Sequence, residues 1–418
     1  MEIPRQCPAL KRGVTMFRPK SGSSARSIRN LSQNEDPAVK SNTIERITDY
    51  IANYELPSPC LVLDVDAVEE NYKEMARLFP SAKIYYAVKA NPAEMLVKRL
   101  DQLGACFDTA SPGEFDMCIR LGIAPSRISY GNTIKKQADI AYAYAQGIRL
   151  FAFDSENELE KIAASAPGSQ VYCRILVESG GAEWPLSRKF GCAPEMALEL
   201  LIKAQELGLD AYGVSFHVGS QQVNLDRWEP AIAKVAEMFA QAKKRGVNLR
   251  LIDMGGGFPT HYRTDVEPIK SYAQKISAAM DKHFGTDLPD VILEPGRSLV
   301  GGAGIIQAEV VLISRKSAEE KTRWVYLDIG KFSGLAETMD EAIKYHIVTS
   351  RDGGPTGPVV LAGPTCDSAD IMYEKTHYEM PLDLKEGDKV LILATGAYTT
   401  TYSSVNFNGF APLGIVCI

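Results

Sequence analysis

Leu249–Gly257 (LRLIDMGGG) and Val291–Arg297 (VILEPGR) carry the clearest structural signal in the chain. Each begins as a run of branched apolar residues, which is typical of a buried strand, and ends in glycine or charged residues. Six runs of the same form precede them: Ile84–Ala90, Cys106–Ala110, Arg127–Asn132, Leu150–Ser155, Val171–Val177 and Tyr212–Gly219. Stretches with helical spacing, such as Glu195–Leu207 and Pro230–Lys244, lie between the runs.

Eight strands separated by seven helical segments predict an α/β fold of the (β/α)8 barrel type, with an open doubly wound sheet as the alternative. In such a barrel the loops that follow the C-terminal ends of the strands build the functional site. Residues with unusual chemistry gather at these ends: Lys89, Asp108, Arg174, His217, Gly255–Gly257, Glu294 and Arg297. The pattern therefore predicts one site at one end of a barrel.

The pattern of alternating strand-like and helical segments ends after residue 300. Strand-like runs at Gln307–Ser314, Trp324–Leu327, Val359–Ala362 and Lys389–Ala394 follow without long helices between them, which indicates a C-terminal all-β domain. Cys60–Val65 (CLVLDV) either adds a strand to this domain or leads into the barrel. We expect a disordered extension at 1–44, the barrel with its lead-in segment at 45–300, and the β domain at 301–418.

Composition narrows the class of protein. The 418 residues are 45% hydrophobic and 23% charged, as in a soluble globular protein, and the net charge of −6 argues against nucleic acid and suits a cationic ligand. No apolar run is long enough to span a membrane. The eight cysteines form no C-x-x-C pair, so we expect reduced thiols in a cytoplasmic protein and no zinc site or other metal. Residues 1–34 are rich in Arg, Lys and Ser, which indicates a disordered tail or a transit peptide.

Three of the strand ends carry reactive groups. Lys89 lies among apolar neighbours, where desolvation would lower the pKa of its amine and let it form a Schiff base with a carbonyl, unless the side chain reaches solvent. The glycines of Gly255–Gly257 leave backbone N–H groups open to a phosphate, or form a tight turn. Glu294 ends an apolar strand and needs a cationic partner, either a protonated ring nitrogen of a cofactor or Arg297.

Several segments, taken in order, are similar to one enzyme family. They read YYAVKANP, FDTAS, SFHVGSQ, DMGGGFP, EPGR, GPTCDSAD and TGAYTT, and they resemble the fold-type III pyridoxal-phosphate (PLP) decarboxylases of ornithine, lysine, arginine and diaminopimelate. The resemblance covers roughly residues 45–418. YGNTIKK, WPLSRKFG and DIGKFSGLAETMDEAIKY look most like bacterial ornithine decarboxylases. The family fold is a PLP-binding barrel of the alanine racemase type followed by a β domain.

The resemblance implies a role for each matching residue. Lys89 matches the lysine that holds the cofactor covalently, His217 the imidazole stacked on its ring, and Glu294 the partner of the ring nitrogen. The phosphate-binding groups match Ser220, Gly256, Gly257, Arg297 and Tyr398. Residues that support Lys89 and the cofactor match Asp108, Glu114 and Arg174. Cys366 and Asp367 match a pair supplied by the neighbouring subunit of a homodimer, with Cys366 as the general acid.

The resemblance also implies a substrate class, a small basic amino acid. Related enzymes read the distal group from a short turn that matches Leu335–Ile343 (LAETMDEAI), where Asp340 is the best match for the contact residue. An acidic turn suits a distal ammonium, so we expect decarboxylation of L-ornithine to putrescine in polyamine biosynthesis, with L-lysine to cadaverine as a second reaction. A lysine-preferring enzyme, a diaminopimelate decarboxylase, a PLP racemase and a non-catalytic regulatory homologue are the alternatives.

Overall fold

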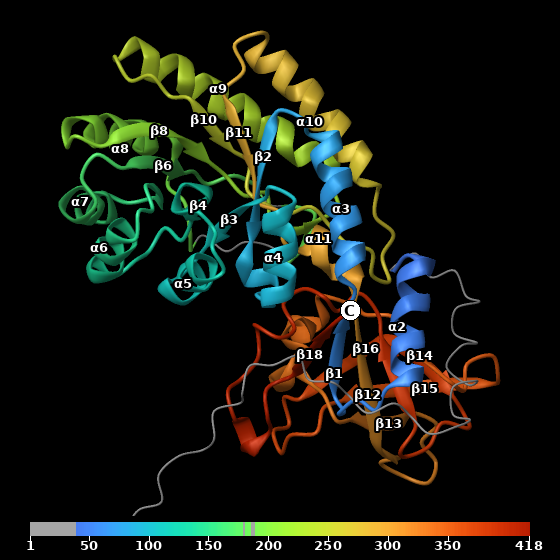
Figure 1. The fold of residues 1–418 in the computed structure, drawn as a ribbon. Coiled ribbons are helices and arrows are strands. Elements are labelled where there is room, and N and C mark those ends of the chain that lie inside the picture. Colours follow the sequence, from blue (N-terminus) through green and yellow to red (C-terminus); the bar gives the residue numbers. More distant parts are fainter. Residues whose placement is uncertain (1–38, 179, 185–188) are drawn as a thin grey trace, which may run out of the picture.

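A computed structural model describes residues 39–178, 180–184 and 189–418 of the chain. The chain forms two domains, and its C-terminus lies where they meet (Figure 1). The N-terminal domain holds a closed barrel of parallel strands in the order β10-β11-β2-β3-β4-β5-β6-β8, which confirms the predicted barrel over the open sheet. Its strands are β2 (Ala82–Ala87), β3 (Cys106–Thr109), β4 (Ile128–Tyr130), β5 (Leu150–Phe153), β6 (Gln170–Arg174), β8 (Asp210–Ser215), β10 (Leu251–Asp253) and β11 (Asp290–Leu293).

The strands end earlier than the apolar runs suggested. Lys89 was expected in a strand, but β2 ends at Ala87 and Lys89 lies in the 3-10 turn η2 (Val88–Ala90). In the same way β11 ends at Leu293, one residue before Glu294. At these two strand ends the last residues of the run leave the ladder, and Lys89 and Glu294 line the cavity at the open end of the barrel. Asp108 and Arg174, by contrast, remain within β3 and β6.

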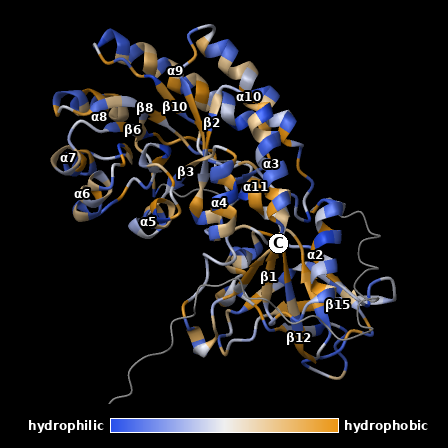
Figure 2. Cartoon of the chain, in the orientation of Figure 1, coloured by the Kyte–Doolittle hydropathy of each residue, from blue (hydrophilic) through white to orange (hydrophobic). Residues whose placement is uncertain are grey.

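Helices surround the barrel on its outer face (Figure 1). They are α3 (Val65–Leu78), α4 (Glu94–Gln102), α5 (Pro112–Arg120), α6 (Gln137–Ala145), α7 (Glu156–Ser165), α8 (Pro194–Glu206), α9 (Trp228–Lys244), α10 (Ile269–Phe284) and the short α11 (Arg297–Val300). In α9 the buried residues include Trp228, Ile232 and Val235, whose spacing is that of one helical face, while Lys243 and Lys244 occupy the last turn. Figure 2 shows the apolar residues concentrated on the strands and on the inward faces of the helices.

The second domain is a mixed β sheet in the order β14-β17-β12-β13-β15-β16, with β1 and β18 joined to it. Its strands are β12 (Gly304–Ser314), β13 (Arg323–Leu327), β14 (Ile347–Thr349), β15 (Thr356–Ala362), β16 (Ile371–Pro381), β17 (Lys389–Ile392) and β18 (Gly414–Cys417). All four predicted strand runs lie in β12, β13, β15 and β17. The long strand β16 was not predicted, because its charged and polar residues hide the apolar pattern.

The lead-in segment belongs to the β domain, although the sequence-based division placed it with the barrel. β1 (Cys60–Leu63) pairs antiparallel with β12 and parallel with β18. Helix α2 (Ser41–Asn53) buries Ile44, Ile47 and Ile51 in the core of the β domain. Residues 41–44 are therefore helical, whereas they had been assigned to a disordered extension. Residues 1–38, and with them the rest of the predicted extension, lie outside the described residues.

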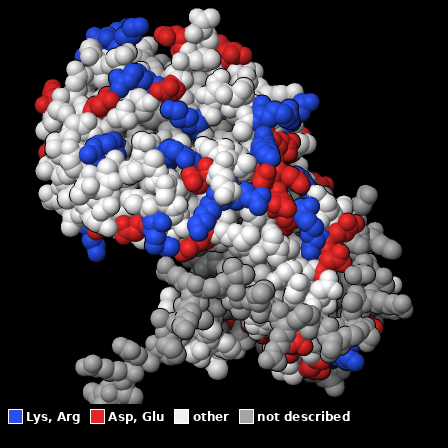
Figure 3. All heavy atoms as spheres, in the orientation of Figure 1, with Lys and Arg blue, Asp and Glu red and all other residues white. Residues whose placement is uncertain are grey.

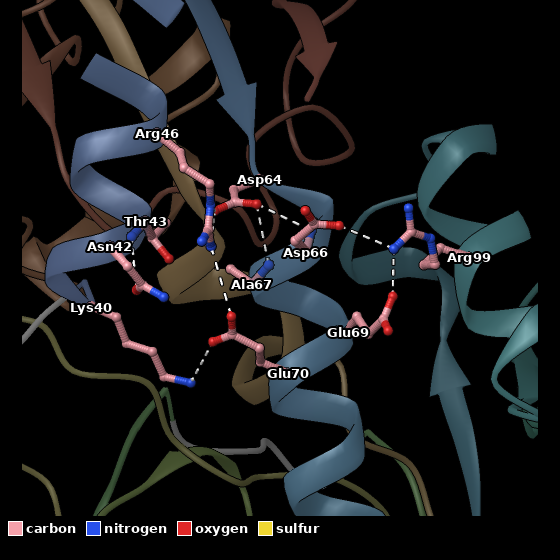
Figure 4. A network of polar contacts seen from close by, with 10 residues as sticks. All are labelled: Lys40, Asn42, Thr43, Arg46, Asp64, Asp66, Ala67, Glu69, Glu70 and Arg99. Carbon is pink, nitrogen blue, oxygen red and sulfur yellow. Dashed lines mark hydrogen bonds and ion pairs between the residues drawn. The ribbon is translucent and has the colours of Figure 1, made fainter. Parts of the chain in front are cut away.

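A polar network joins the two domains (Figure 4). Asp64, almost fully buried, caps the start of α3 by accepting hydrogen bonds from the backbone N–H groups of Asp66 and Ala67. The guanidinium of Arg46 on α2 donates to its other oxygen at 2.6 Å. Side chains of both charges gather where α2 and α3 meet on the molecular surface (Figure 3). One carboxylate thus ties a helix of the β domain to the first helix of the barrel.

Three negative findings concern the described residues. Within the described ranges, no helix is long and apolar enough to cross a membrane. Among the described cysteines no disulfide forms, and the thiol of Cys366 is exposed. The same part of the chain contains no group of three or more His, Cys, Asp or Glu side chains placed to hold a metal ion.

Candidate active site

A cavity of about 410 Å³ opens at the C-terminal end of the barrel, where the β domain meets it. Ten of the fourteen residues predicted for the site line it: Lys89, Asp108, Arg174, His217, Ser220, Gly256, Gly257, Glu294, Arg297 and Tyr398. Asp108 and Arg174 lie in β3 and β6, Ser220 begins the short strand β9 (Ser220–Gln222), and Tyr398 comes from the β domain. The others lie in the segments that follow β2, β8, β10 and β11. The fold therefore brings together residues that are more than 300 positions apart in the sequence.

Lys89 reaches into the open cavity, with 49% of its side chain exposed. Its Nζ lies 3.1 Å from Oδ2 of the buried Asp108, which also accepts a hydrogen bond from Ser129 at its other oxygen. Burial acts to lower the pKa of Lys89, but the charges of Asp108, Tyr398 and Glu294 outweigh it, so the pKa is raised. The expectation of a lowered pKa was therefore wrong for the chain alone, because Asp108 stabilises the ammonium.

Glu294 does not pair with Arg297. It shares a hydrogen bond with Asp253, a fully buried carboxyl at the end of β10 whose Oδ1 accepts from the N–H of Gly255 at 2.9 Å. Burial raises the pKa of Glu294 well above its ordinary value, with Asp108 and Asp253 adding to the effect. Burial also raises the pKa of Asp253 to about 7. Two carboxyls that hold a proton between them are poised to accept a cationic ring nitrogen.

His217 is held neutral. Burial lowers the pKa of its imidazole well below the ordinary value, and the nearby charges of Arg174 and Lys89 act in the same direction. Its Nδ1 accepts a hydrogen bond from the N–H of Gly219 at 3.0 Å, which places the proton of the neutral ring on Nε2. A neutral, fixed imidazole on the cavity wall offers a flat face against which an aromatic ring can stack.

The glycine run forms a tight cradle. Gly255 and Gly257 adopt positive φ angles of 64° and 97°, which favour glycine. A Cβ on Gly256 would lie 2.6 Å from the carbonyl oxygen of Glu294, so the backbone approaches its neighbour too closely for any side chain. The cradle therefore presents backbone rather than side chains to the cavity.

Arg297 lies beside this cradle and is almost fully buried. Its Nη1 donates to the hydroxyl of Tyr262 at 2.7 Å, and its Nη2 donates to Ser220 at 3.1 Å. The ring of Tyr398 lies 5.0 Å from its guanidinium carbon. The remaining donor, Nε, is buried without a partner. An unsatisfied buried donor is costly, and a phosphate oxygen would satisfy it.

Glu337 completes the wall on the side of the β domain. It lies in the turn η7 (Ala336–Glu341), is buried, and receives both Nη groups of Arg297 in a two-point ion pair. Asp340 of the same turn is exposed, has a positive φ of 52° and does not line the cavity. Of the carboxylates in the predicted specificity turn, the chain thus turns Glu337, not Asp340, toward the cavity.

Three further predicted residues stand outside the cavity lining. Glu114, in the first turn of α5, accepts a hydrogen bond from the N–H of Ala110 at 2.7 Å, and burial raises its pKa. Cys366 and Asp367 lie in an exposed loop of the β domain, where the N–H of Cys366 donates to Asn408. Within one chain, therefore, the predicted general acid does not reach the site.

Sequence reasoning missed other parts of the wall. The cavity is also lined by Ala87, Ala110, Gly131, Asn132, Thr133, Phe190, Phe258, Gly296, Glu337 and Tyr402. Phe190 lies within the segment WPLSRKFG that carried part of the family resemblance, but no role in the site was assigned to it. Its ring lies 5.2 Å from the guanidinium carbon of Arg174. Residues 185–188 of this segment lie outside the described part of the chain.

Together these groups define an enzyme site for a cofactor with a carbonyl, an aromatic ring nitrogen and a phosphate. Lys89 supplies an amine, the Glu294–Asp253 pair faces a ring nitrogen, and the glycine cradle with the unpartnered Nε of Arg297 fits a phosphate. PLP is a group of this composition, and the residues present fit it.

Comparison with known proteins identifies the family. Residues 65–301 match the family described as pyridoxal-dependent decarboxylase, pyridoxal binding domain. The chain is 36% identical over 357 residues to a lysine/ornithine decarboxylase of Selenomonas ruminantium, covering 85% of this chain and 88% of the relative. It is 31% identical over 366 residues to an ornithine decarboxylase of Schizosaccharomyces pombe, covering 85% and 82%.

A solved structure agrees with this. The lysine/ornithine decarboxylase of Vibrio vulnificus complexed with cadaverine is 31% identical to the chain, with a TM-score of 0.81 over 91% of this chain and 99% of that one. The chain belongs to the family of pyridoxal-dependent decarboxylases. It is a PLP-dependent decarboxylase of basic amino acids, of the lysine/ornithine type. When bound, PLP supplies the electron sink that takes up the charge left by loss of CO2.

Proposed function

We propose that the enzyme decarboxylates L-ornithine to putrescine, a step of polyamine biosynthesis, and accepts L-lysine as a second substrate that yields cadaverine. The charge balance of the cavity supports a cationic substrate. Its lining holds three cations and three carboxylates, and the bound cofactor adds about two negative charges on its phosphate against one positive charge on its ring nitrogen. A second ammonium at the far end of the substrate would balance this excess, whereas the distal carboxylate of diaminopimelate would be repelled.

Glu337 is the group that we propose to receive the distal ammonium, in preference to Asp340. It is the carboxylate of the turn that faces the cavity. Arg297 keeps its free Nε for the phosphate while its Nη groups hold Glu337 in place. The distance from Lys89, which would hold the carbonyl end of the cofactor, to Glu337 then sets how long a diamino acid the cavity accepts.

The remaining roles follow from the positions of the side chains. Lys89 holds the cofactor and is steadied by Asp108, with Glu114 and Arg174 as further supports. Ser220, Gly256, Gly257, Arg297 and Tyr398 hold the phosphate, His217 stacks on the ring and Glu294 binds its nitrogen. Cys366 then returns a proton to the former α-carbon as general acid.

Within one chain Cys366 and Asp367 stand outside the cavity lining, which supports their supply by a second subunit. We therefore propose a homodimer with two shared sites. Mixing Lys89→Ala with Cys366→Ala subunits should restore about a quarter of the wild-type activity if the subunits exchange randomly. Verified exchange without recovery would overturn the shared-site arrangement.

The substrate is tested by measuring CO2 release from L-ornithine and L-lysine side by side, with diaminopimelate and both alanine enantiomers as controls. We expect a higher kcat/KM for ornithine. A one-methylene difference changes binding by only about 1–3 kcal/mol, so lysine should still react. Turnover of diaminopimelate, or interconversion of the alanines with neither basic substrate consumed, would refute the proposal, and a protein that binds PLP but turns over nothing would be the regulatory homologue.

The specificity residue is tested with a matched pair. Glu337→Gln should raise the KM for ornithine at least about tenfold, because it removes a charged partner of the distal ammonium. Asp340→Asn should leave KM unchanged. The opposite pattern would return the contact to Asp340, the residue that the sequence resemblance favoured.

A further inference from the structure

Lys135 is a buried charge to which none of the roles above applies. It lies in the loop between β4 and α6, and its side chain is 0% exposed. Its Nζ donates to the carbonyl oxygens of Asn132 at 2.8 Å and Ala152 at 2.6 Å, and lies 3.0 Å from Oε1 of Glu158. These three oxygens belong to the loop itself, to β5 and to α7, so the ammonium joins the loop to both of these elements.

The network around this lysine is costly to build. Glu158 on α7 is 4% exposed at its side chain and also pairs with Lys161, so one buried carboxylate faces two cations. Burial lowers the pKa of Lys135 to about 8, with Glu158 and Asp154 opposing the effect and Lys161 adding to it. Because well-packed apolar residues often replace such a network at no loss of stability, stability alone does not account for it.

The loop that Lys135 anchors is a wall of the active site. Gly131, Asn132 and Thr133 all line the cavity. Asn132 is held through both its backbone and its side chain. Its carbonyl oxygen accepts a hydrogen bond from Lys135, and its side-chain amide donates to the carbonyl oxygen of Ala110 at 3.3 Å.

Gly131 links this wall to the reactive lysine. A Cβ at Gly131 would lie 2.0 Å from Oδ1 of Asp108, so the backbone of the loop packs directly against that carboxylate. The other oxygen of Asp108 holds Lys89. Oδ1 of Asp108 also accepts a hydrogen bond from Ser129, so movement of the loop away from the barrel would remove one of two contacts that fix this carboxylate beside Lys89.

We infer that Lys135 is a positioning residue: its buried ammonium clamps the loop 131–135 to β5 and α7, and the loop in turn holds Asp108 against Lys89. The groups that face Lys89 are Asp108, Glu114, His217, Glu294 and Tyr398. Loosening the clamp would reduce only the contribution of Asp108. The Lys89 amine would then lose its proton at lower pH, and the apo-protein would bind PLP less tightly.

The test uses the purified full-length protein freed of PLP, and PLP itself as the probe. The variants are Lys135→Met, the double variant Lys135→Met/Glu158→Gln, and Lys203→Met as a control that removes a cation paired with Glu156 and Glu160 on the surface of α7. Lys161 is not used as the control, because its Nζ also donates to the carbonyl oxygen of Lys135. PLP affinity is measured by fluorescence titration, and the rate of PLP association is followed as a function of pH. Urea unfolding of each apo-variant reports the fold.

We expect Lys135→Met to weaken PLP binding at least about tenfold, the worth of a charged hydrogen bond, and to shift the pH profile of association to lower pH. The double variant should recover stability, because the carboxylate that lost its contact with Lys135 is then replaced by a neutral amide, but it should not recover PLP affinity. Lys203→Met should bind PLP like the wild type. These readouts involve no substrate, so they stand or fall separately from the ornithine assignment.

A double variant with wild-type affinity and pH profile would overturn the inference and leave Lys135 a structural residue. The same follows if Lys203→Met weakens PLP binding as much as Lys135→Met, since the effect would then come from a general loss of charge pairing on α7. If Lys135→Met fails to fold, the double variant decides the question.

Discussion

Arg297 and Glu337 form a buried two-point ion pair that joins the barrel to the β domain at the active site, with Nη1 of the arginine 2.8 Å from Oε2 of the glutamate. Arg297→Met should lower the free energy of unfolding of the apo-protein by about 3–5 kcal/mol, because it leaves Glu337 charged and buried without a partner. Adding Glu337→Gln should restore most of this loss. Urea unfolding checks both variants, and a loss below about 1 kcal/mol in the single variant would mean that Glu337 finds water instead.

The Asp253–Glu294 pair should make the stability of the apo-protein depend on pH. Burial raises the pKa of Asp253 to about 7 and that of Glu294 well above its ordinary value. The folded protein then binds more protons than the unfolded chain, so its stability falls as the pH rises from about 4 toward 7, by up to about 1.4 kcal/mol per pH unit for each proton. Asp253→Asn should flatten this slope.

Unfolding free energies at pH 5, 6 and 7 provide the measurement. With PLP bound, a cationic ring nitrogen beside Glu294 favours the ionised carboxylate, so the slope should also be smaller in the holo-protein. Equal slopes in the wild type and in Asp253→Asn would show that the pair carries no shared proton.

Gly131→Ala should disrupt the site through packing alone. The new methyl would fall 2.0 Å from Oδ1 of Asp108, and overpacking of this kind costs about 1–3 kcal/mol. Gly113→Ala is the control, since its nearest neighbour would be 3.9 Å away and the glycine lies in α5, where alanine is favoured. Thermal unfolding and PLP titration should show a loss in the first variant and none in the second. Equal behaviour of the two would mean that the loop yields without disturbing Asp108.

The contact between α2 and α3 should be a measurable part of the stability. Arg46→Met removes the cation beside Asp64, whose side chain is 1% exposed, and should lower the free energy of unfolding by about 1–3 kcal/mol. The loss is limited because Asp64 still accepts hydrogen bonds from two backbone N–H groups. Lys40→Met removes an exposed pair with Glu70 in the same network and should change stability by less than about 0.5 kcal/mol (Figure 4). Urea unfolding measures both variants. If both lose a similar free energy of unfolding, the effect of Arg46→Met comes from surface charge and not from the buried carboxylate of Asp64.

Local patterns in the sequence were enough to predict the barrel fold. Apolar runs that end in polar residues occur in the eight barrel strands, and parallel strands place all their C-terminal ends on one side, so the polar residues at those ends had to meet. Ten of the fourteen predicted site residues line the cavity for this reason. The strand β16 and the partnership of α2 with the β domain were not predicted, because a mixed sheet pairs segments that no local period connects.

Tertiary structure alone decided how the site groups act on one another. The sequence indicated a lysine with a lowered pKa, yet Asp108 lies 3.1 Å away and raises it. It indicated Asp340 in the specificity turn, yet the turn directs Glu337 inward to meet Arg297. The strength of an electrostatic interaction depends on the distance between the charges and on their burial. Neither quantity can be read from the spacing of residues in the sequence. The sequence determined which residue types lie at the strand ends. The closure of the barrel then paired Lys89 with Asp108, and the packing of the β domain on the barrel paired Arg297 with Glu337.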